Sequence, residues 1–413
     1  MRILIFGINY SPELTGIGKY TGEMGTWLVA RGHDVAVVTA KPYYPEWEIH
    51  PVYRRGGWMK EQWDGATVYR VPLYVPKEVT AKKRVLHELS FLGGVLPPWF
   101  ALLLKKKYDV VISISPPFHL GFYAWAYAKL RGAKLVTHIQ DLQVDAAKEL
   151  GMINNRRLLN GMFRAERFLL RHSDAVSSIS LGMKRKILEK GIPDSKYIMF
   201  PNWVDVYAIR PLPKSRSLRR EWNIPDTDTV VLYSGNLGEK QGLEIILEAA
   251  EHFRSQKQIH FIICGTGGAG DRLKELAAQA GLLQVRFYPL QPYDKLSALL
   301  ATADIHLVLQ KKSASDLVMP SKLTGILASG GFPIVSTVPD SALYEVVAGH
   351  RLGLVIEPES TDALVKGLQQ ALTTDLTVFR ENGRRYAEQF LTKEGILPEF
   401  EQHLRKLVGY ENT

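Results

Sequence analysis

The chain has 413 residues, of which 46% are hydrophobic and 23% are charged, and its formal net charge is +10. This length exceeds one ordinary domain, and the composition is typical of a folded soluble protein rather than a disordered or fibrous one. The single cysteine, Cys264, excludes an intramolecular disulfide and a zinc site built from several thiolates.

Short apolar stretches alternate with amphipathic ones along the whole chain, which predicts parallel sheets wound with helices. In the first half we expect strands at Arg2–Gly7, Asp34–Thr39, Val68–Val71, Val110–Ile114, Lys134–His138, Ala175–Ser178 and Tyr197–Phe200. A second series is expected at Thr229–Ser234, Ile259–Cys264, Val285–Tyr288, Ile305–Leu309, Pro333–Ser336 and Leu354–Ile356. Between the two series, residues 210–216 are rich in proline and charge, as linkers are. The predicted fold class is therefore α/β, with two doubly wound domains of similar size.

The charge pattern of the first half suggests an anionic surface as partner. Basic clusters at 82–84 and 105–107 flank the uncharged run 89–104, which Pro97-Pro98 is expected to break. This run is shorter than the 20 or so residues of a spanning helix, so we expect peripheral attachment to a membrane surface. A pair of core helices with solvated ends is the alternative. Basic residues are otherwise spread along the chain, so we expect no nucleic-acid partner. The start of the chain lacks the layout of a signal peptide, which predicts a cytoplasmic location.

Glycine-rich loops after strands predict binding of phosphate groups. Gly16 and Gly18 follow the first strand, and Gly235 to Gly242 and Gly265 to Gly270 follow two strands of the second half. Glycines let a backbone approach an anion, and the next helix offers free N–H groups. The first loop is not G-x-G-x-x-G, and the second strand ends without a carboxylate, which disfavours a dinucleotide oxidoreductase.

A lysine at a helix start strengthens this interpretation. Pro320 and Ser321 are helix-start residues, and Lys322 follows them in the first turn. A cation there opposes the helix dipole unless an anion offsets it. Lys322 and Lys240 would then bind a diphosphate together with the loop amides. The one Asp-x-Asp, at 226–228, reads as a turn, and no cluster has the spacing of metal ligands, so we expect neither metal nor cofactor.

The end of a first-half strand offers two candidate bases. His138 closes the strand and Asp141 lies just beyond it, where reactive groups of parallel sheets gather. Either side chain could accept the proton of an attacking hydroxyl. Asp145, one helical turn later, is a third choice.

With these motifs in place, the chain resembles the family 4 retaining glycosyltransferases, and within them the fucosyltransferases of colanic acid biosynthesis. The resemblance covers nearly the whole chain and depends on residues 7–20, 138–141, 201–203, 233–242 and 320–323. It implies a GT-B fold with an acceptor-binding domain at 1–205, a nucleotide-sugar-binding domain at 206–392, and a segment at 393–413 whose helix, Lys393–Leu407, returns to the first domain. The implied reaction transfers a sugar, fucose from GDP-fucose, to a lipid-linked oligosaccharide at the inner face of the membrane.

The resemblance also assigns residues to the donor. It implies phosphate contacts from Gly16, Gly18, Gly235, Asn236, Lys240, Gln241, Gly265, Gly267, Ser321 and Lys322, and a ribose contact from Glu345. The chain departs from the family pattern at several of these places. Asn236 and Gln241 stand where Arg and Lys are usual, the family's Glu-x7-Glu pair is missing around residues 316–327, and Gln140 occupies the position of the usual catalytic histidine.

Two other functions fit two doubly wound domains. A nucleotide-sugar 2-epimerase would turn over free nucleotide sugar without an acceptor. A catalytically degenerate subunit would bind the donor without transferring it, which the departures at Gln140 and around residues 316–327 would explain.

Overall fold

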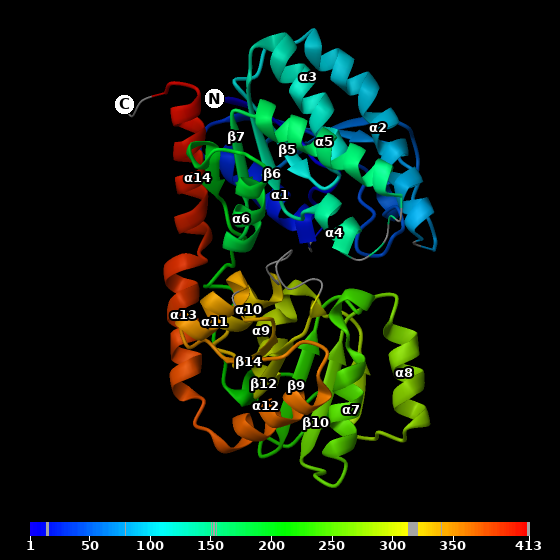
Figure 1. The fold of residues 1–413 in the computed structure, drawn as a ribbon, viewed down its shortest axis with the longest axis vertical. Coiled ribbons are helices and arrows are strands. Elements are labelled where there is room, and N and C mark those ends of the chain that lie inside the picture. The colour runs from blue at the N-terminus through cyan, green and yellow to red at the C-terminus, as the bar shows by residue number, and fades with distance from the viewer. Residues whose placement is uncertain are drawn as a thin grey trace. The chain divides into compact units, whose positions relative to one another are not determined.

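The computed structural model describes residues 1–13, 16–78, 80–149, 151, 153, 155–312, 321–339 and 341–410. The chain divides into two compact units, Met1–Pro201 with Ile396–Thr413 (unit 1) and Asn202–Gly395 (unit 2). In each unit, parallel strands alternate with helices (Figure 1), which confirms the predicted α/β class with two doubly wound sheets.

Unit 1 is built on an eight-stranded sheet, as far as the described residues show, in the order β3-β4-β2-β1-β5-β6-β7-β8. Its strands are β1 (Arg2–Phe6), β2 (Asp34–Ala40), β3 (Met59–Trp63), β4 (Ala66–Val71), β5 (Val110–Ser115), β6 (Lys134–Ile139), β7 (Ala175–Ser178) and β8 (Tyr197–Met199). Strands buried on both faces need continuous apolar runs. This explains the apolar sequence from Ile3 to Phe6 in the central strand β1, where all four residues are fully buried.

The edge strand β3 is absent from the sequence prediction. It pairs antiparallel with β4, with Trp63 opposite Ala66, and Asp64 and Gly65 form the turn with positive φ angles. Asp-Gly between two alternating stretches is a strong hairpin signal. The prediction missed β3 because its residues, MKEQW, are mostly polar and carry no apolar run.

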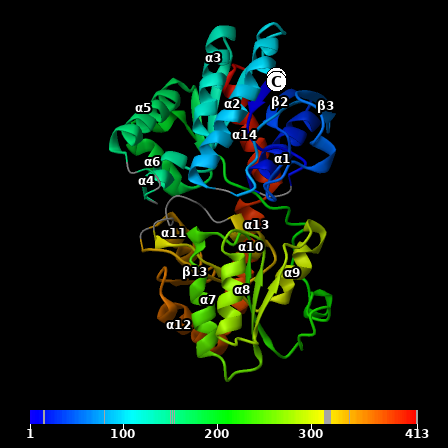
Figure 2. The ribbon, with the colours of Figure 1, turned by 90° about the vertical axis from the view of Figure 1, so that its right-hand side faces the viewer.

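The helices of unit 1 are α1 (Gly16–Ala30), α2 (Ala81–Leu103), α3 (Gly121–Arg131), α4 (Gln143–Glu149), α5 (Arg156–His172), α6 (Leu181–Glu189) and α14 (Lys393–Leu407, of which residues from Ile396 belong to this unit). Helix α3 packs against both α2 and α5, and the three lie side by side in Figure 2. The closing helix α14 is fixed to the turn between α1 and β2, because Glu401 accepts hydrogen bonds from His33 at 3.0 Å and from Arg31 at 3.2 Å.

Helix α2 corrects one expectation. The run 89–104 was expected to be broken at Pro97-Pro98, but α2 is one continuous helix with both prolines inside it. Over Lys82–Leu103 it is long and apolar enough to cross a membrane by length and composition, a test that core helices of soluble proteins also pass. Its inner face, with Phe91, Val95 and Leu102, is fully buried in the core of unit 1.

Unit 2 carries a six-stranded parallel sheet in its described residues, ordered β11-β10-β9-β12-β13-β14. The strands are β9 (Thr229–Ser234), β10 (Ile259–Cys264), β11 (Val285–Tyr288), β12 (Ile305–Val308), β13 (Pro333–Ser336) and β14 (Leu354–Ile356). The helices are α7 (Glu244–His252), α8 (Gly270–Gln279), α9 (Leu296–Thr302), α10 (Ser321–Ala328), α11 (Ala342–Gly349), α12 (Thr361–Thr373) and α13 (Thr377–Phe390). Residues of α7, α8 and α12 join the core on one face of the sheet, and residues of α10, α11 and α13 join a second core.

Candidate functional site

The glycine loops of unit 2 lie at one edge of its sheet. Strands β9 and β10 are parallel neighbours, with Ser234 beside Cys264, so the loops that begin at Gly235 and Gly265 leave the sheet side by side. Helix α10 follows β12, the other neighbour of β9, and begins at Ser321. The carboxyl ends of these parallel strands therefore bring the predicted phosphate-binding segments to the same edge.

The two loops touch through their backbones. Leu237 N–H donates to the Thr266 carbonyl at 2.8 Å, and Ala269 N–H donates to the Leu237 carbonyl at 2.9 Å. Gly265 has a φ of +153°, and a Cβ there would lie 1.8 Å from the Gly235 carbonyl oxygen. At Gly267 a Cβ would lie 2.5 Å from the Leu237 carbonyl oxygen. The glycines at 265 and 267 are thus required for loop packing, and a phosphate contact from them stays a prediction.

Lys322 places a buried cation beside these loops. Its Nζ lies 3.7 Å from the centroid of the Tyr233 ring, and a Cβ built on Gly235 would lie 3.3 Å from that Nζ. The residue as a whole is half-buried, but the ammonium nitrogen is inaccessible and has no hydrogen-bond partner among the described residues. Burial lowers the pKa of Lys322 to about 7. A desolvated cation without a hydrogen-bonded anion is costly, so this position is suited to an anionic ligand.

The other predicted donor residues lie around the same edge. Asn236 is exposed and its carbonyl accepts from the Tyr233 hydroxyl at 2.7 Å, while the Gln241 side-chain oxygen is buried without a partner in the described part of the chain. Lys240 is half-buried, and its carbonyl accepts from Lys311 N–H at 2.8 Å. Ser321 is exposed at the start of α10, and Pro320 lies outside the described residues. Glu345 is exposed in the first turn of α11, beyond the end of β13.

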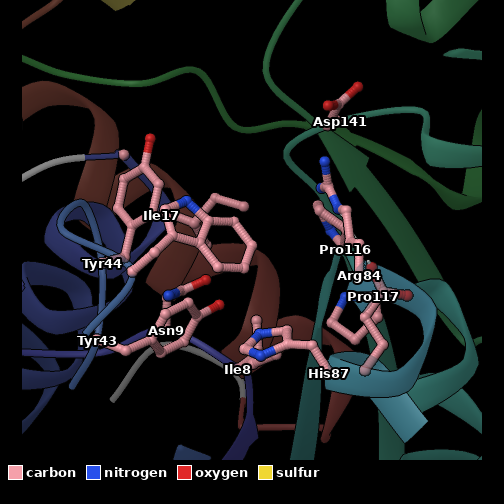
Figure 3. Close-up of a pocket in the computed structure, with 13 residues that line it drawn as sticks. Ile8, Asn9, Ile17, Tyr43, Tyr44, Arg84, His87, Pro116, Pro117 and Asp141 are labelled. Atoms are coloured by element: carbon pink, nitrogen blue, oxygen red, sulfur yellow. Dashed lines mark ion pairs between the residues drawn. The ribbon is translucent and has the colours of Figure 1, made fainter. Parts of the chain in front are cut away.

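Unit 1 contains a separate pocket of about 190 Å³. Its lining comes from five stretches of the chain: Ile8 and Asn9; Gly16 and Ile17; Tyr43, Tyr44 and Trp47; Arg84, His87 and Glu88; and Pro116, Pro117 and Asp141. Figure 3 shows Asp141 and Arg84 on one side of this pocket, with Tyr44 and Ile17 across from them. Aromatic rings combined with carboxylates and a guanidinium suit a polar ligand with apolar ring faces, such as a sugar.

Two buried carboxylates hold the pocket walls. Glu13 accepts hydrogen bonds from the backbone N–H groups of Tyr43 and Tyr44, both at 3.0 Å, and from the Asn9 amide at 2.8 Å. Burial raises the pKa of Glu13 to about 7, against the lowering effect of these donors. Glu88 accepts from the Gln143 amide at 2.9 Å, which connects α2 to α4, and burial raises its pKa as well.

Gly16 and Gly18 belong to this pocket region of unit 1. Gly16 lines the pocket with a φ of +58° at the start of α1. A Cβ at Gly18 would lie 2.7 Å from the Glu13 Cβ, so that glycine is required for the packing of Glu13. Contact of either glycine with a phosphate stays a prediction.

The two candidate bases lie in different environments. Asp141 lines the pocket, half-buried, whereas His138 is buried in the sheet. His138 Nδ1 lies 2.9 Å from the Ser177 hydroxyl and its Nε2 lies 2.9 Å from the Gln140 amide nitrogen. Burial lowers the pKa of His138 to about 3. Asp141 is therefore the better placed of the two, because both nitrogens of the enclosed His138 ring are engaged, and a catalytic role for either residue stays a prediction.

Asp145, the third choice, is held in an ion-pair network. The Lys190 ammonium, just after the end of α6, pairs with both Asp145 of α4 and the buried Glu166 of α5. This arrangement indicates a structural function for Asp145.

Several residues of the pocket were missed by sequence reasoning. Tyr44, Trp47, His87 and Glu88 lie in stretches with no motif, and Arg84 was noted only as part of a basic cluster. Only the chain's path through space brings these residues together. Glu13 lies within residues 7–20, which carry the family resemblance, but its place beside the pocket was not predicted, although a carboxylate between Pro12 and a glycine-rich turn was a usable signal.

No group of three or more His, Cys, Asp or Glu side chains that could hold a metal ion occurs among the residues that the structure describes. The expectation of a reaction without metal or cofactor stays a prediction.

Comparison with known proteins gives both family and fold. Residues 15–203 match the family described as glycosyl transferase 4-like domain, and residues 214–390 match the family described as glycosyl transferases group 1. The chain is 42% identical over 413 residues to an Escherichia coli (strain K12) protein named as a candidate colanic acid biosynthesis glycosyl transferase, WcaI, with 98% of this chain and 100% of the relative covered.

Two solved structures are similar over nearly the whole chain. The sucrose-phosphate synthase of Thermosynechococcus elongatus has a TM-score of 0.78 at 16% identity, covering 99% of this chain and 100% of that one. The Anabaena protein Alr3699/HepE, in complex with UDP and glucose, has a TM-score of 0.73 at 14% identity, covering 98% and 100%. These likenesses confirm the GT-B fold, and with the family matches they show that the chain belongs to the glycosyltransferases that join a glycosyl transferase 4-like domain to a group 1 domain.

Proposed function

We propose that this glycosyltransferase retains anomeric configuration and transfers fucose from GDP-fucose to a lipid-linked oligosaccharide, in the synthesis of an exopolysaccharide similar to colanic acid. The name of the Escherichia coli relative supports the pathway, at 42% identity over the full length. The proposed location is cytoplasmic, at the inner face of the membrane.

The observation that carries the proposal is the buried ammonium of Lys322. It lies against the Tyr233 ring and Gly235, next to two backbone-lined loops and in the first turn of α10. In the proposal, the donor diphosphate binds here, with the Ser321 hydroxyl and the loop amides completing the site. The charge on the diphosphate grows as it leaves, so the ammonium stabilises the transition state more than the ground state.

The acceptor would bind in the pocket of unit 1. Its hydroxyl oxygen forms a bond to the anomeric carbon while the bond from that carbon to the phosphate oxygen breaks, and the electron pair leaves with the nucleoside diphosphate. The proton of the hydroxyl passes to Asp141, which lines the pocket. Attack from the face that the diphosphate leaves gives retention.

The direct test is transfer with purified protein. GDP-fucose, UDP-glucose and a dTDP-sugar are compared by thermal shift, and at 100 times its dissociation constant the true donor stabilises the fold by about 2.7 kcal/mol. Each donor is then incubated with a lipid-linked oligosaccharide, and the anomeric configuration of the product is determined by NMR.

Each alternative function has its own result in this assay. Conversion of the nucleotide sugar without an acceptor would identify a 2-epimerase, and binding without transfer or hydrolysis would identify a degenerate subunit. Transfer is expected to be unchanged in excess EDTA, since lysine and backbone amides neutralise the diphosphate in the proposal. Loss of transfer that manganese restores would contradict the metal-free mechanism.

A further inference from the structure

Three neighbouring helices of unit 1 expose basic but no acidic side chains. Helices α2, α3 and α5 contain ten Lys or Arg residues and two glutamates, Glu88 and Glu166, and both glutamates are buried. The helices form one layer (Figure 2): Trp99 of α2 donates to the Tyr123 carbonyl of α3 at 2.9 Å, and Trp125 of α3 packs edge-on against Phe168 of α5 at 5.2 Å. We call the outer side of this layer the basic–apolar face.

An apolar stripe runs along the exposed side of α2 on this face. Its large side chains are 40% to 59% exposed and recur at helical spacing: Val85, Leu86, Leu89, Leu96 and Phe100. A contiguous exposed apolar surface usually marks an interaction site. The opposite side of the same helix is packed in the core, so α2 is held by the protein and only its outer half is available to another phase.

Positive charge flanks the stripe. Lys82 to Arg84 begin the helix and Lys105 to Lys107 follow it, although Lys83 pairs with the exposed Glu78 at 3.2 Å and Arg84 lies 3.6 Å from Glu88. On α5, Arg157, Arg164 and Arg171 recur every seven residues on one exposed face, with Arg167 between them. Exposed leucine and phenylalanine side chains suit the acyl boundary of an anionic membrane, and the lysine and arginine side chains that flank them suit its headgroups. Nucleic acid would be complementary to the charges but not to the stripe.

We propose that the basic–apolar face docks unit 1 on an anionic lipid bilayer, with α2 lying in the interface and the arginines of α5 on the headgroups. The helix then has two functions. Its outer side meets lipid, while Arg84, His87 and Glu88 line the pocket. Docking therefore seats the pocket at the membrane surface, where a lipid-linked acceptor is presented; this last consequence rests on the proposed function.

Vesicle binding tests the proposal without any substrate. The full chain is sedimented with phosphatidylcholine vesicles, with and without phosphatidylglycerol, at low and high salt. We expect partitioning to the anionic vesicles that weakens with salt. The double substitution Leu89→Glu with Phe100→Glu should reduce partitioning at least tenfold, and Arg164→Ala with Arg167→Ala about 25-fold, at about fivefold for each charge. Leu283→Glu, at a residue 92% exposed in unit 2, is the matched control and should bind as the unchanged protein does.

Specific outcomes would overturn the proposal. Equal binding to neutral and anionic vesicles would do so. An equal loss of vesicle binding in Leu283→Glu and in Leu89→Glu with Phe100→Glu would do so as well. The protein forming dimers in sedimentation equilibrium that the substitutions Leu89→Glu with Phe100→Glu dissociate would overturn it too. So would DNA that competes with the vesicles and abolishes binding to them. Transfer to a lipid-free oligosaccharide is measured in parallel: the docking variants should retain it while losing transfer to acceptor in vesicles. Failure of all transfer with vesicle binding intact would contradict the proposed function and leave the docking face standing.

Discussion

The two candidate sites of this glycosyltransferase are built in opposite ways. In unit 2 the walls are backbone: two glycine loops pack against each other, and one lysine whose ammonium nitrogen is buried, Lys322, supplies charge. In unit 1 the walls are side chains from five separate stretches, and the Glu13 carboxylate accepts backbone N–H groups of another stretch and so holds the two together. The first arrangement suits a charged group common to many ligands, and the second suits a ligand whose shape must be distinguished.

This contrast determines how each site fails. We call the sheet edge of unit 2 that carries Gly235, Gly265 and Lys322 the donor edge. A side chain at Gly265 would overlap the Gly235 carbonyl, so the loops of the donor edge could not pack with any other residue there. We expect the pocket of unit 1 to keep its fold when one side chain at its surface is changed, so its residues can be tested one chemical group at a time.

The largest effect is expected at Asp141. Asp141→Asn keeps the shape of the side chain and removes its ability to accept a proton, so turnover should fall by ~10²–10⁴-fold while donor affinity is unchanged. The measurements are the transfer rate at saturating donor and the donor affinity by calorimetry. A turnover within a few-fold of the unchanged enzyme would show that another group takes the proton.

His138→Asn is the companion variant for this prediction. Because His138 is enclosed between Ser177 and Gln140, its loss should lower stability by about 1–3 kcal/mol and leave turnover per folded molecule nearly unchanged. If His138→Asn removes turnover in a fully folded protein and Asp141→Asn does not, the choice between the two bases is reversed.

Lys322→Met is the next largest perturbation and tests the donor edge. Methionine fills the space of the stem over the Tyr233 ring but carries no charge. Loss of a charged hydrogen bond to phosphate is worth about 1.5–3 kcal/mol, so turnover should fall roughly ten- to a hundredfold, and more than donor affinity does. The unliganded variant should be as stable as the unchanged protein or more so, since a buried cation is removed. Equal loss of turnover and affinity would mean that the lysine contributes to ground-state binding alone.

The same contrast explains what could be predicted from sequence. The strands and the donor edge follow from local patterns: buried parallel strands need apolar runs, and glycines next to a strand end mark a loop that closely approaches its neighbour. The pocket of unit 1 could not be predicted, because nothing local connects Trp47 to Glu88 or to Asp141. His138 was predicted as a base from its position at a strand end, but the periodicity of the sequence does not show that its ring turns inward to Ser177.

A pH dependence separates the lysine from the backbone of the donor edge. Burial lowers the pKa of Lys322 to about 7, so near pH 8 the unliganded protein has mostly lost this proton. A diphosphate stabilises the charged form, and donor binding there must take up a proton. Affinity should therefore fall as pH rises above 7, by up to about tenfold per unit, until the pKa of the complex is reached. Titration calorimetry in buffers of different ionisation enthalpy measures the proton, and Lys322→Met should abolish both uptake and pH dependence.

Stability without donor should show the opposite slope. The folded state loses the Lys322 proton near pH 7, whereas the unfolded chain keeps it up to about 10.5. The unfolded state thus binds more protons between these values, so this residue makes the protein more stable as pH rises through that window. Denaturant unfolding at pH 7 and pH 9, compared between the unchanged protein and Lys322→Met, isolates the contribution. An identical slope in both would contradict a depressed pKa at Lys322.

The smallest effect on turnover is expected from a pair of substitutions at Glu13, which distinguish position from charge in the pocket of unit 1. The carboxylate accepts from Tyr43 and Tyr44 N–H and from the Asn9 amide, and it is buried. Glu13→Gln retains an oxygen for the two backbone donors, and Asn9 can turn its own oxygen toward the new amide, so turnover should change by no more than a few-fold. Glu13→Ala leaves buried backbone N–H groups unpaired, at a cost of about 1–3 kcal/mol each in unfolding free energy. The melting temperature and the acceptor KM are measured for both. If Glu13→Gln keeps the melting temperature and the acceptor KM of the unchanged protein, Glu13 acts by holding the 43–47 segment in place. If Glu13→Gln changes them as much as Glu13→Ala does, the pocket needs the carboxyl group itself.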